Sequence, residues 1–152
     1  IRTAVEQLAR CGGEPLCAEG DEVFLFPTPE QLCGLTEVQL TGCGLGYRTR
    51  YIQHAAAQAA AHTLDLDALA VLPDNALFSR LLTLDGVGKK VANCVCLFGY
   101  GRTAMAPIDV WIQRLIDEEF GGRDPFPAYG QQAGIVQQYL FYYKRSTSTQ
   151  KK

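Results

Sequence analysis

The sequence predicts an all-α fold of roughly eight short helices. Three observations support this prediction. Apolar residues recur at helical spacing along most of the chain, and residues that cap or end helices separate these segments. The segment 20–26 is the only acceptable strand candidate, and because it is a single short run flanked by prolines, we expect an extended connection and no sheet.

The first half of the chain is expected to contain several helices. Thr3–Cys11 carries apolar side chains at helical spacing and is followed by two glycines that end it. Thr28 is an N-cap residue followed by proline at the first helical position, and Thr36 caps a short helix through Leu40. The alanine-rich segment Tyr47–Ala61 has strong helix propensity and no breaker, so it should be the longest helix of this half.

The second half continues the same pattern and ends in a polar tail. Residues 1–145 are expected to form one domain, and residues 146–152 a disordered tail, because the tail lacks apolar residues. The expected helices are Asp65–Ala70, a helix opened by Pro73 with Leu77, Phe78, Leu81 and Leu82 on one face, Lys89–Phe98, a helix capped by Asp109 and ended by Gly121 and Gly122, and Gln131–Lys144.

Composition and charge exclude several functional classes. The chain has 152 residues, of which 47% are hydrophobic, and no apolar run of membrane-spanning length. The net charge of -2 argues against a generally basic nucleic-acid binder. However, residues 1–85 contain 5 Lys/Arg and 11 Asp/Glu, whereas residues 86–152 contain 9 and 5. The second half therefore has a positive balance that could face phosphates.

The six cysteines do not form a metal-binding pattern. They include no CxxC pair and do not cluster with His54 or His62. We expect small buried thiols in a reducing compartment. The cysteines are Cys11, Cys17, Cys33, Cys43, Cys94 and Cys96.

The segment 78–92 indicates two helices joined by a tight turn. Gly86 and Gly88 flank Val87, so the backbone can reach positive φ and approach a ligand closely, while Val87 can be buried between the helices. The free N–H groups that open the second helix at Lys89 suit an anion such as a DNA phosphate. On the Gly-x-Gly pattern alone, an ordinary helix connection is the stronger interpretation.

The longer string LxxLxGVGxKVAxCVCLF, followed by Pro-Ile-Asp-Val, resembles the helix-hairpin-helix DNA glycosylase superfamily, and within it the 8-oxoguanine DNA glycosylases. The resemblance extends to GLGYRTRY at 44–51 and to the last helix, and so covers nearly the whole chain. It implies a helical glycosylase bundle that excises oxidised purine, chiefly 8-oxoguanine, from double-stranded DNA. It also implies a second activity, cleavage of the strand at the abasic site.

The resemblance implies that Lys90 is the nucleophile and Asp109 its carboxylate partner. In the family, the lysine attacks the sugar C1′, expels the base and forms a Schiff base that permits β-elimination. Lys90 lies in the first turn of a helix, where the helix dipole and partial burial favour the neutral amine. The alternatives are an ordinary surface lysine and an aspartate that only caps a helix; capping and catalysis are compatible.

The resemblance also implies a base pocket and a wedge. Gln137 and Phe141 share a helix face and match the family's glutamine and phenylalanine, which read and stack on the extruded base; on spacing alone, a helix with Ile135, Tyr139 and Leu140 in the core would be favoured. Cys94, one turn after Lys90, matches the cysteine on the other face of the base. Tyr47 and Arg48 match the residues that fill the gap and bond the orphaned cytosine. Gly86, Val87, Gly88 and Lys89 are the expected hairpin contacts to DNA.

Two departures from the family pattern affect these expectations. Trp111 stands where the family usually has a phosphate-contacting histidine two residues after the aspartate. The family's N-terminal domain and asparagine-rich segment have no counterpart before Ile1, and we expect their absence to weaken damage discrimination.

The same family resemblance bears on cofactors, alternative functions, oligomeric state and location. An iron–sulfur relative would need four cysteines after the hairpin helices, and no cysteine follows Cys96, so no such cluster is expected. A monovalent or divalent cation between the hairpin and a DNA phosphate stays open. The two alternatives are a monofunctional alkylbase glycosylase, which normally lacks a lysine at position 90, and a non-enzymatic DNA-binding module. We expect a monomer in the bacterial cytoplasm and nucleoid, or in the nucleus.

Overall fold

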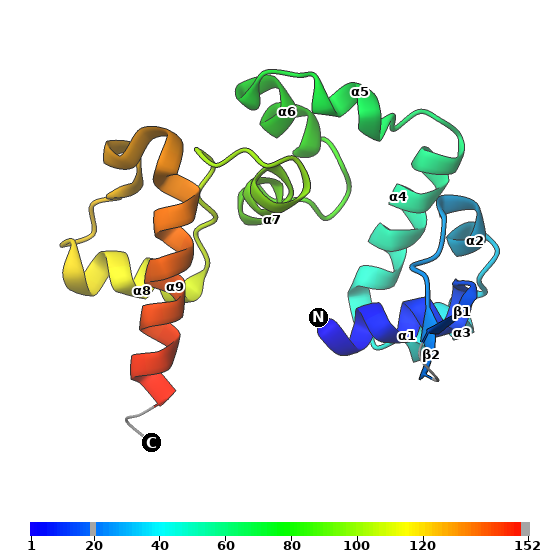
Figure 1. Ribbon diagram of the computed structural model, residues 1–152. Coiled ribbons are helices and arrows are strands. Elements are labelled where there is room, and N and C mark those ends of the chain that lie inside the picture. Colours follow the sequence, from blue (N-terminus) through cyan, green and yellow to red (C-terminus); the bar gives the residue numbers. More distant parts are fainter. Residues whose placement is uncertain (19–20, 150–152) are drawn as a thin grey trace. The chain divides into compact units, whose positions relative to one another are not determined.

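The computed structural model describes residues 1–18 and 21–149 and is mostly helical, which confirms the predicted fold class (Figure 1). The chain divides into two compact units, Ile1–Ala68 and a second that begins at Leu69. Among the described residues, every helix is too short or too polar to cross a lipid bilayer.

The first unit consists of short helices whose starts are fixed by capping. Thr28 and Gln31 form a reciprocal capping box at the start of α2, and Thr36 and Gln39 form a second one at the start of α3. The helices are α1 (Arg2–Gly12), α2 (Pro29–Cys33), α3 (Glu37–Gly42) and α4 (Thr49–Ala60), which follows a 3₁₀ turn at Gly46–Arg48.

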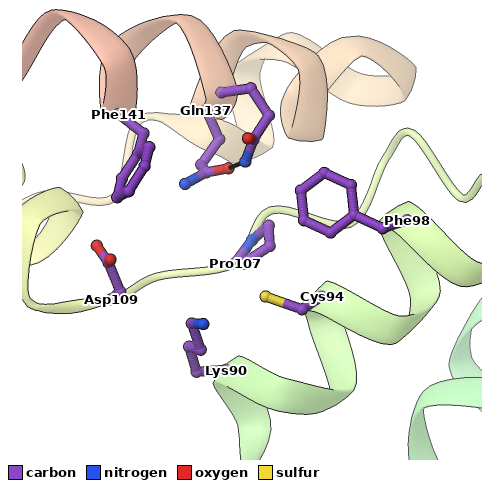
Figure 2. A pocket seen from close by; sticks show the side chains of 8 residues that line it. Lys90, Cys94, Phe98, Pro107, Asp109, Gln137 and Phe141 are labelled. Atoms are coloured by element: carbon purple, nitrogen blue, oxygen red, sulfur yellow. Dashed lines mark hydrogen bonds between the residues drawn. The ribbon is translucent and has the colours of Figure 1, made fainter. Parts of the chain in front are cut away.

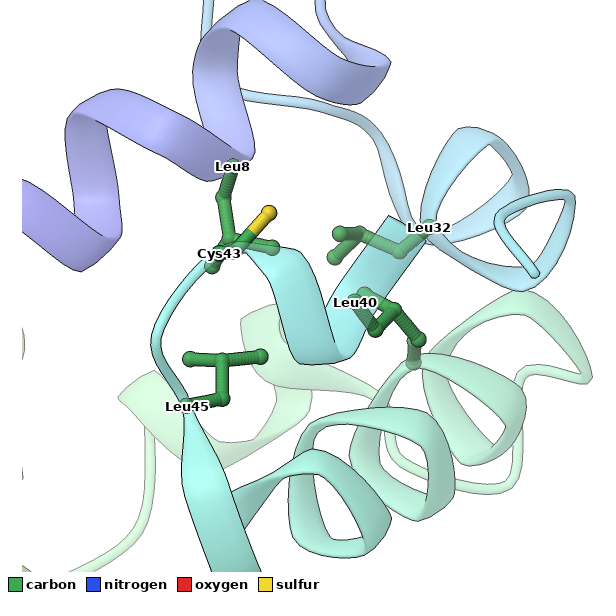
Figure 3. Close-up of a cluster of buried hydrophobic side chains, with 6 residues drawn as sticks. Leu8, Leu32, Leu40, Cys43 and Leu45 are labelled. Carbon is green, nitrogen blue, oxygen red and sulfur yellow. The ribbon is translucent and has the colours of Figure 1, made fainter. Parts of the chain in front are cut away.

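The apolar faces of these helices meet in one cluster (Figure 3). Leu40 is fully buried, and α2 packs against α4. Close packing of this kind supplies most of the stability of short helices, because isolated helices of this length are marginal in water. The buried members are Leu8, Leu32, Leu40, Cys43, Leu45 and Ala56.

The prediction of no sheet is wrong. Strands β1 (Pro15–Ala18) and β2 (Asp21–Phe24) pair as an antiparallel hairpin, with Leu16 opposite Val23. Both of these side chains are exposed, at 47% and 44%. The face that carries Leu16 and Val23 is therefore open to solvent, while Phe24 on the other face is half-buried beneath the Arg10 guanidinium. So few buried apolar residues do not produce the alternating pattern by which strands are recognised.

The second unit contains the predicted helix–turn–helix segment. Leu77 and Leu81 are buried on the first helix, as expected, while Leu82 lies at the surface. The second helix continues through a π-helical turn at Val95–Gly99. The helices are α5 (Leu66–Ala70), which crosses the unit boundary, α6 (Asp74–Leu81), α7 (Lys89–Cys94), α8 (Val110–Glu119) and α9 (Ala133–Thr149), which a 3₁₀ segment at Phe126–Gln132 precedes.

Helices α8 and α9 pack together around a second apolar cluster. Lys144 on α9 also forms an ion pair with Glu118 on α8. The buried members of the cluster are Ile112, Ile116, Phe126 and Ala133, and Ala106, Ile108, Leu140 and Phe141 pack against them.

The prediction of a disordered tail from Ser146 is wrong as far as Thr149, because α9 continues to that residue. Ser146 Oγ donates to the carbonyls of Tyr142 and Tyr143, and Thr147 Oγ1 donates to those of Tyr143 and Lys144. These hydroxyls bond within the helix instead of competing with it. The rest of the predicted tail, residues 150–152, lies outside the described residues.

Candidate active site

Lys90 is the second residue of α7, and its side chain is exposed. The partial burial expected for it is therefore not found. The side chain points into the space between α7, α9 and the segment that leads into α8 (Figure 2). The lysine is thus accessible to a large substrate.

Asp109 is the N-cap of α8, as predicted. Its Oδ1 accepts hydrogen bonds from the backbone N–H groups of Trp111, at 3.0 Å, and Ile112, at 2.9 Å. Pro107 is buried and Ile108 packs against the apolar cluster, so the two residues just before the carboxylate are anchored. These bonds fix the carboxylate facing the same space as Lys90 (Figure 2).

One pocket of about 120 Å³ brings the expected catalytic and base-contacting residues together. Three segments of the second unit supply its walls: α7 with its π-helical continuation, the segment before α8, and α9. Its lining residues are Lys90, Cys94, Phe98, Pro107, Asp109, Gln137, Gln138 and Phe141.

A second, more open hollow of about 450 Å³ adjoins this pocket. Lys90 and Asp109 line both of them, whereas Ile108, Val110 and Gln113 line only the second. The amine and the carboxylate therefore stand at the boundary between an inner pocket and an outer surface. An atom that reacts at this boundary could hold one of its substituents in the inner pocket and the others over the outer hollow.

Gln137 and Phe141 lie on the face of α9 that lines the pocket, as their spacing predicts. Gln137 is only 2% exposed, and its Oε1 accepts a hydrogen bond from Gln138 Nε2. The alternative interpretation of this helix is wrong for two residues, since Tyr139 is 75% and Ile135 43% exposed. A buried amide beside an aromatic ring is suited to binding a flat polar ring system.

Gly134 determines how closely α9 approaches the segment before α8. Its N–H donates to the Thr103 carbonyl at 2.7 Å. A Cβ at this position would lie 2.5 Å from the Met105 carbonyl oxygen and 2.8 Å from Leu97 Cδ1. Gly134 precedes Gln137 by three residues and Phe141 by seven, so it shares their helix face and lets them reach the pocket.

The hairpin turn needs a left-handed backbone at one glycine only. Gly86 has φ of 77°, so the backbone reaches positive φ at this turn as expected, whereas Gly88 has φ of -89°, which other residues also adopt. Val87 is half-buried, and its N–H donates to the Leu84 carbonyl at 3.1 Å. Lys89 is exposed at the start of α7. The contacts of these residues with DNA stay a prediction.

Tyr47 and Arg48 belong to the first unit and lie just before α4. Tyr47 is 69% exposed, the Arg48 guanidinium lies 4.6 Å from the centre of its ring, and the Tyr51 ring packs edge-on at 6.3 Å. This stack presents an aromatic and a cationic group to solvent. The role of the pair as a wedge stays a prediction.

Sequence reasoning missed several residues at the site. Phe98 and Gln138 line the inner pocket, and Gln113 lines the outer hollow. Phe98 follows Cys94 by the same four residues that separate Cys94 from Lys90, and this spacing could have identified it. Trp111, at the position of the expected histidine, is half-buried beneath the Arg114 guanidinium, 5.6 Å away.

Two cysteine sites differ in their chemistry. Burial raises the pKa of the Cys96 thiol, and the nearby Asp74 carboxylate adds to this shift; Cys94 instead is partly exposed in the pocket. Across the described residues, no group of three or more His, Cys, Asp and Glu side chains is arranged to hold a metal ion.

The chain is similar to proteins that act on damaged DNA. It matches no protein-family model. Over 93% of its length it is 29% identical to a probable N-glycosylase/DNA lyase of Methanothermobacter thermautotrophicus, of which it covers 54%. It is also 34% identical, over 67% of its length, to an N-glycosylase/DNA lyase of Saccharomyces cerevisiae, of which it covers 30%.

A solved structure shows the same relationship in three dimensions. The 8-oxoguanine glycosylase/lyase of Clostridium acetobutylicum, in complex with double-stranded DNA containing cytosine opposite 8-oxoguanine, matches 97% of the chain with a TM-score of 0.88 and 27% identity. The match covers 54% of that protein. The chain therefore spans about half the length, or less, of the proteins that it matches here.

Proposed function

Because this chain belongs to the 8-oxoguanine glycosylase/lyase type of the helix-hairpin-helix superfamily, we propose that it removes 8-oxoguanine from double-stranded DNA and cleaves the strand at the resulting site. One observation carries the proposal: Lys90 and Asp109, from two different segments, line the same pocket together with a buried amide and an aromatic ring. A DNA-binding module would have no use for this combination.

In the first step, the neutral amine of Lys90 attacks C1′ of the damaged nucleotide. A bond forms between Nζ and C1′, the glycosidic bond breaks, and its electron pair leaves with the base, which then takes up a proton. Asp109 stabilises the positive charge that develops on the sugar and can accept the proton that the amine loses. The two backbone N–H groups that bond Asp109 Oδ1 hold this carboxylate in place.

In the second step, the sugar ring opens and the Lys90–C1′ bond becomes a Schiff base. Removal of a proton from C2′ then forms a C2′=C3′ double bond and breaks the C3′–O3′ bond, whose electron pair leaves with O3′ as part of the 5′-phosphate of the released strand. The position of Lys90 and Asp109 at the boundary of two hollows supports this sequence of steps. The sugar would lie at the boundary, with the base in the inner pocket and the phosphates over the outer hollow.

The inner pocket would hold the extruded base. Phe141 offers a ring to stack on one face and Cys94 a thiol for the other, while the buried Gln137 amide meets the polar edge. Outside the pocket, the hairpin at Gly86–Lys89 would contact phosphate, and Tyr47 and Arg48 would fill the gap in the duplex and bond the orphaned cytosine. A cation between hairpin and phosphate would be held by carbonyl oxygens of the turn, which are ligands that hard cations prefer.

Borohydride trapping tests the proposed lysine chemistry. A duplex with 8-oxoguanine opposite cytosine should give a covalent protein–DNA adduct with the 152-residue chain, because borohydride reduces the Schiff base. Lys90→Gln should abolish the adduct. Lys89→Gln, which removes the neighbouring lysine, should weaken DNA binding yet still give the adduct when protein is in excess.

Three other outcomes would contradict parts of this proposal. An adduct that persists in Lys90→Gln removes Lys90 from its role. DNA binding without turnover of 8-oxoguanine, hypoxanthine or 3-methyladenine would favour a non-enzymatic module. Release of 3-methyladenine without strand cleavage would favour a monofunctional alkylbase glycosylase.

A further inference from the structure

Two consecutive glutamines on α9 line the inner pocket, and one holds the amide of the other. Gln137 is almost fully buried and Gln138 is half-buried. Gln138 Nε2 donates a hydrogen bond to Gln137 Oε1, and Figure 2 shows the Gln137 side chain reaching into the pocket. The Oε1 end of the Gln137 amide is therefore turned toward Gln138 before any base enters, and its Nε2 end is left for the base.

The direction of an amide decides which base edge it can read. A primary amide has a donor end and an acceptor end. A guanine-type edge presents an acceptor, O6, beside a donor, N1–H, whereas an adenine-type edge presents a donor, N6–H, beside an acceptor, N1. Turning the amide by half a rotation exchanges its two ends, so an amide that fits one edge opposes the other in the same pose.

We propose that Gln138 is a specificity-determining residue that fixes the Gln137 amide in the direction complementary to a guanine-type edge. The inference rests on the proposed function, since it assumes that Gln137 faces the base. Gln138 acts through Gln137 and is a positioning residue. If the Gln137 amide alone turned over, two NH₂ groups would face each other in a buried site and the hydrogen bond between the glutamines would be lost; to restore it, the Gln138 amide would have to turn as well.

The position of Gln138 suits this role. It follows Gly134 by four residues, and so it lies on the helix face that packs closely against the Thr103 and Met105 carbonyls. A donor on this anchored face keeps its place better than one on a loop. A side chain at residue 138 that only accepts hydrogen bonds would instead bond the NH₂ end of the Gln137 amide, and so would turn that amide over.

Two lesions isolate the edge that the pair would read. 8-Oxoguanine and 8-oxoadenine share the oxidised five-membered ring and differ at the Watson–Crick edge. We would measure kcat/KM for each, opposite cytosine, and divide each value by the rate of borohydride trapping at a preformed abasic site. The abasic site has no base, so that rate reports folding and Lys90 chemistry alone.

Matched variants change only the polarity of residue 138. Gln138→Met keeps the length but cannot donate, and should lower the 8-oxoguanine to 8-oxoadenine ratio by about 10-fold, the value of one hydrogen bond. Gln138→Glu can only accept, should draw the Gln137 NH₂ toward itself, and should lower the ratio further. Gln132→Glu places the same charge at an exposed position before α9 and should leave the ratio unchanged.

The outcomes separate this inference from the proposed function. Wild-type ratios in both Gln138 variants would overturn the inference alone, provided the wild-type protein excises 8-oxoguanine. An equal loss on both lesions would mark a merely structural residue and overturn it too. Failure of the wild-type protein to excise 8-oxoguanine would overturn the proposed function, and the inference with it.

Discussion

Gly134 at the start of α9 lies directly against the backbone of Met105, so closely that a Cβ at residue 134 would be 2.5 Å from the Met105 carbonyl oxygen. Carbonyl oxygens in a packed segment have little room to move. This contact places one face of α9 against the segment that leads to Asp109. The distance between the two walls of the pocket therefore depends on the absence of one methyl group.

We expect Gly134→Ala to lower the free energy of unfolding by about 1–3 kcal/mol, as overpacking does. The usual gain from alanine in a helix, of about 1 kcal/mol, is too small to offset the displacement. Urea denaturation measures this change. Gly42→Ala in α3 is the control, because its Cβ would meet no heavy atom within 4 Å, and it should be neutral or stabilising.

Asp109 combines a structural and a proposed catalytic role, and two substitutions separate them. Asp109→Asn keeps an oxygen that can cap α8, so stability should change little, while adduct formation should slow on the order of 100-fold because the charge is lost. Asp109→Ala should also cost about 1 kcal/mol for the lost cap. Thermal melts and trapping rates test this; equal trapping by wild-type and Asn proteins would limit Asp109 to capping.

The two hairpin glycines should respond differently to substitution. Gly86→Ala forces an L-residue to φ near 77° and should destabilise the chain by about 1 kcal/mol. Gly88→Ala should leave stability unchanged, since φ is -89° and its Cβ would meet nothing within 4 Å. If a phosphate approaches the backbone at Gly88, the alanine should weaken DNA binding, which fluorescence anisotropy measures. Unchanged binding would remove Gly88 from the contact surface.

Thiol labelling should distinguish the cysteines by burial and pKa. Burial raises the pKa of Cys96 and of Cys43, so at pH 8 both hold less of the reactive thiolate than an ordinary cysteine does. Iodoacetamide should therefore modify Cys11, Cys17, Cys33 and Cys94 in the native protein, and all six cysteines after denaturation. Mass spectrometry identifies the sites. Modification of Cys94 should block base excision by the wild-type protein. It should not lower the excision rate of the Cys94→Ala variant, which has no thiol at this position.

Much of the fold could be predicted from the sequence, because local patterns of apolar and capping residues indicate helices. Thr28, Thr36 and Asp109 cap helices where their positions predict. The hairpin of β1 and β2 was missed because pairing between two four-residue segments depends on backbone contacts, and the facing pair Leu16 and Val23 stays at the surface. The helical end of α9 was missed because serine and threonine hydroxyls can bond either within a helix or against it.

The site could be predicted only in part, and for a related reason. Lys90 with Cys94, and Gln137 with Phe141, share faces at four-residue spacing, so each pair was visible. The outer hollow beside Gln113 and the hydrogen bond from Gln138 to Gln137 depend on how close the segments lie. The contact at Gly134 sets that closeness, and no short-range pattern records it.

The π-helical turn at Val95–Gly99, closed by the Tyr100 N–H on the Val95 carbonyl, holds one residue more than a regular turn needs. Phe98 lies inside this widened turn, is 64% exposed and lines the pocket. Deleting Val95 would remove the extra residue and let the backbone return to α-helical bonding, while the chain after Gly99 keeps its direction. The aromatic wall of the pocket is thus placed by a local change of helix pitch, and a single-codon deletion would move Phe98 without altering any residue that lines the cavity.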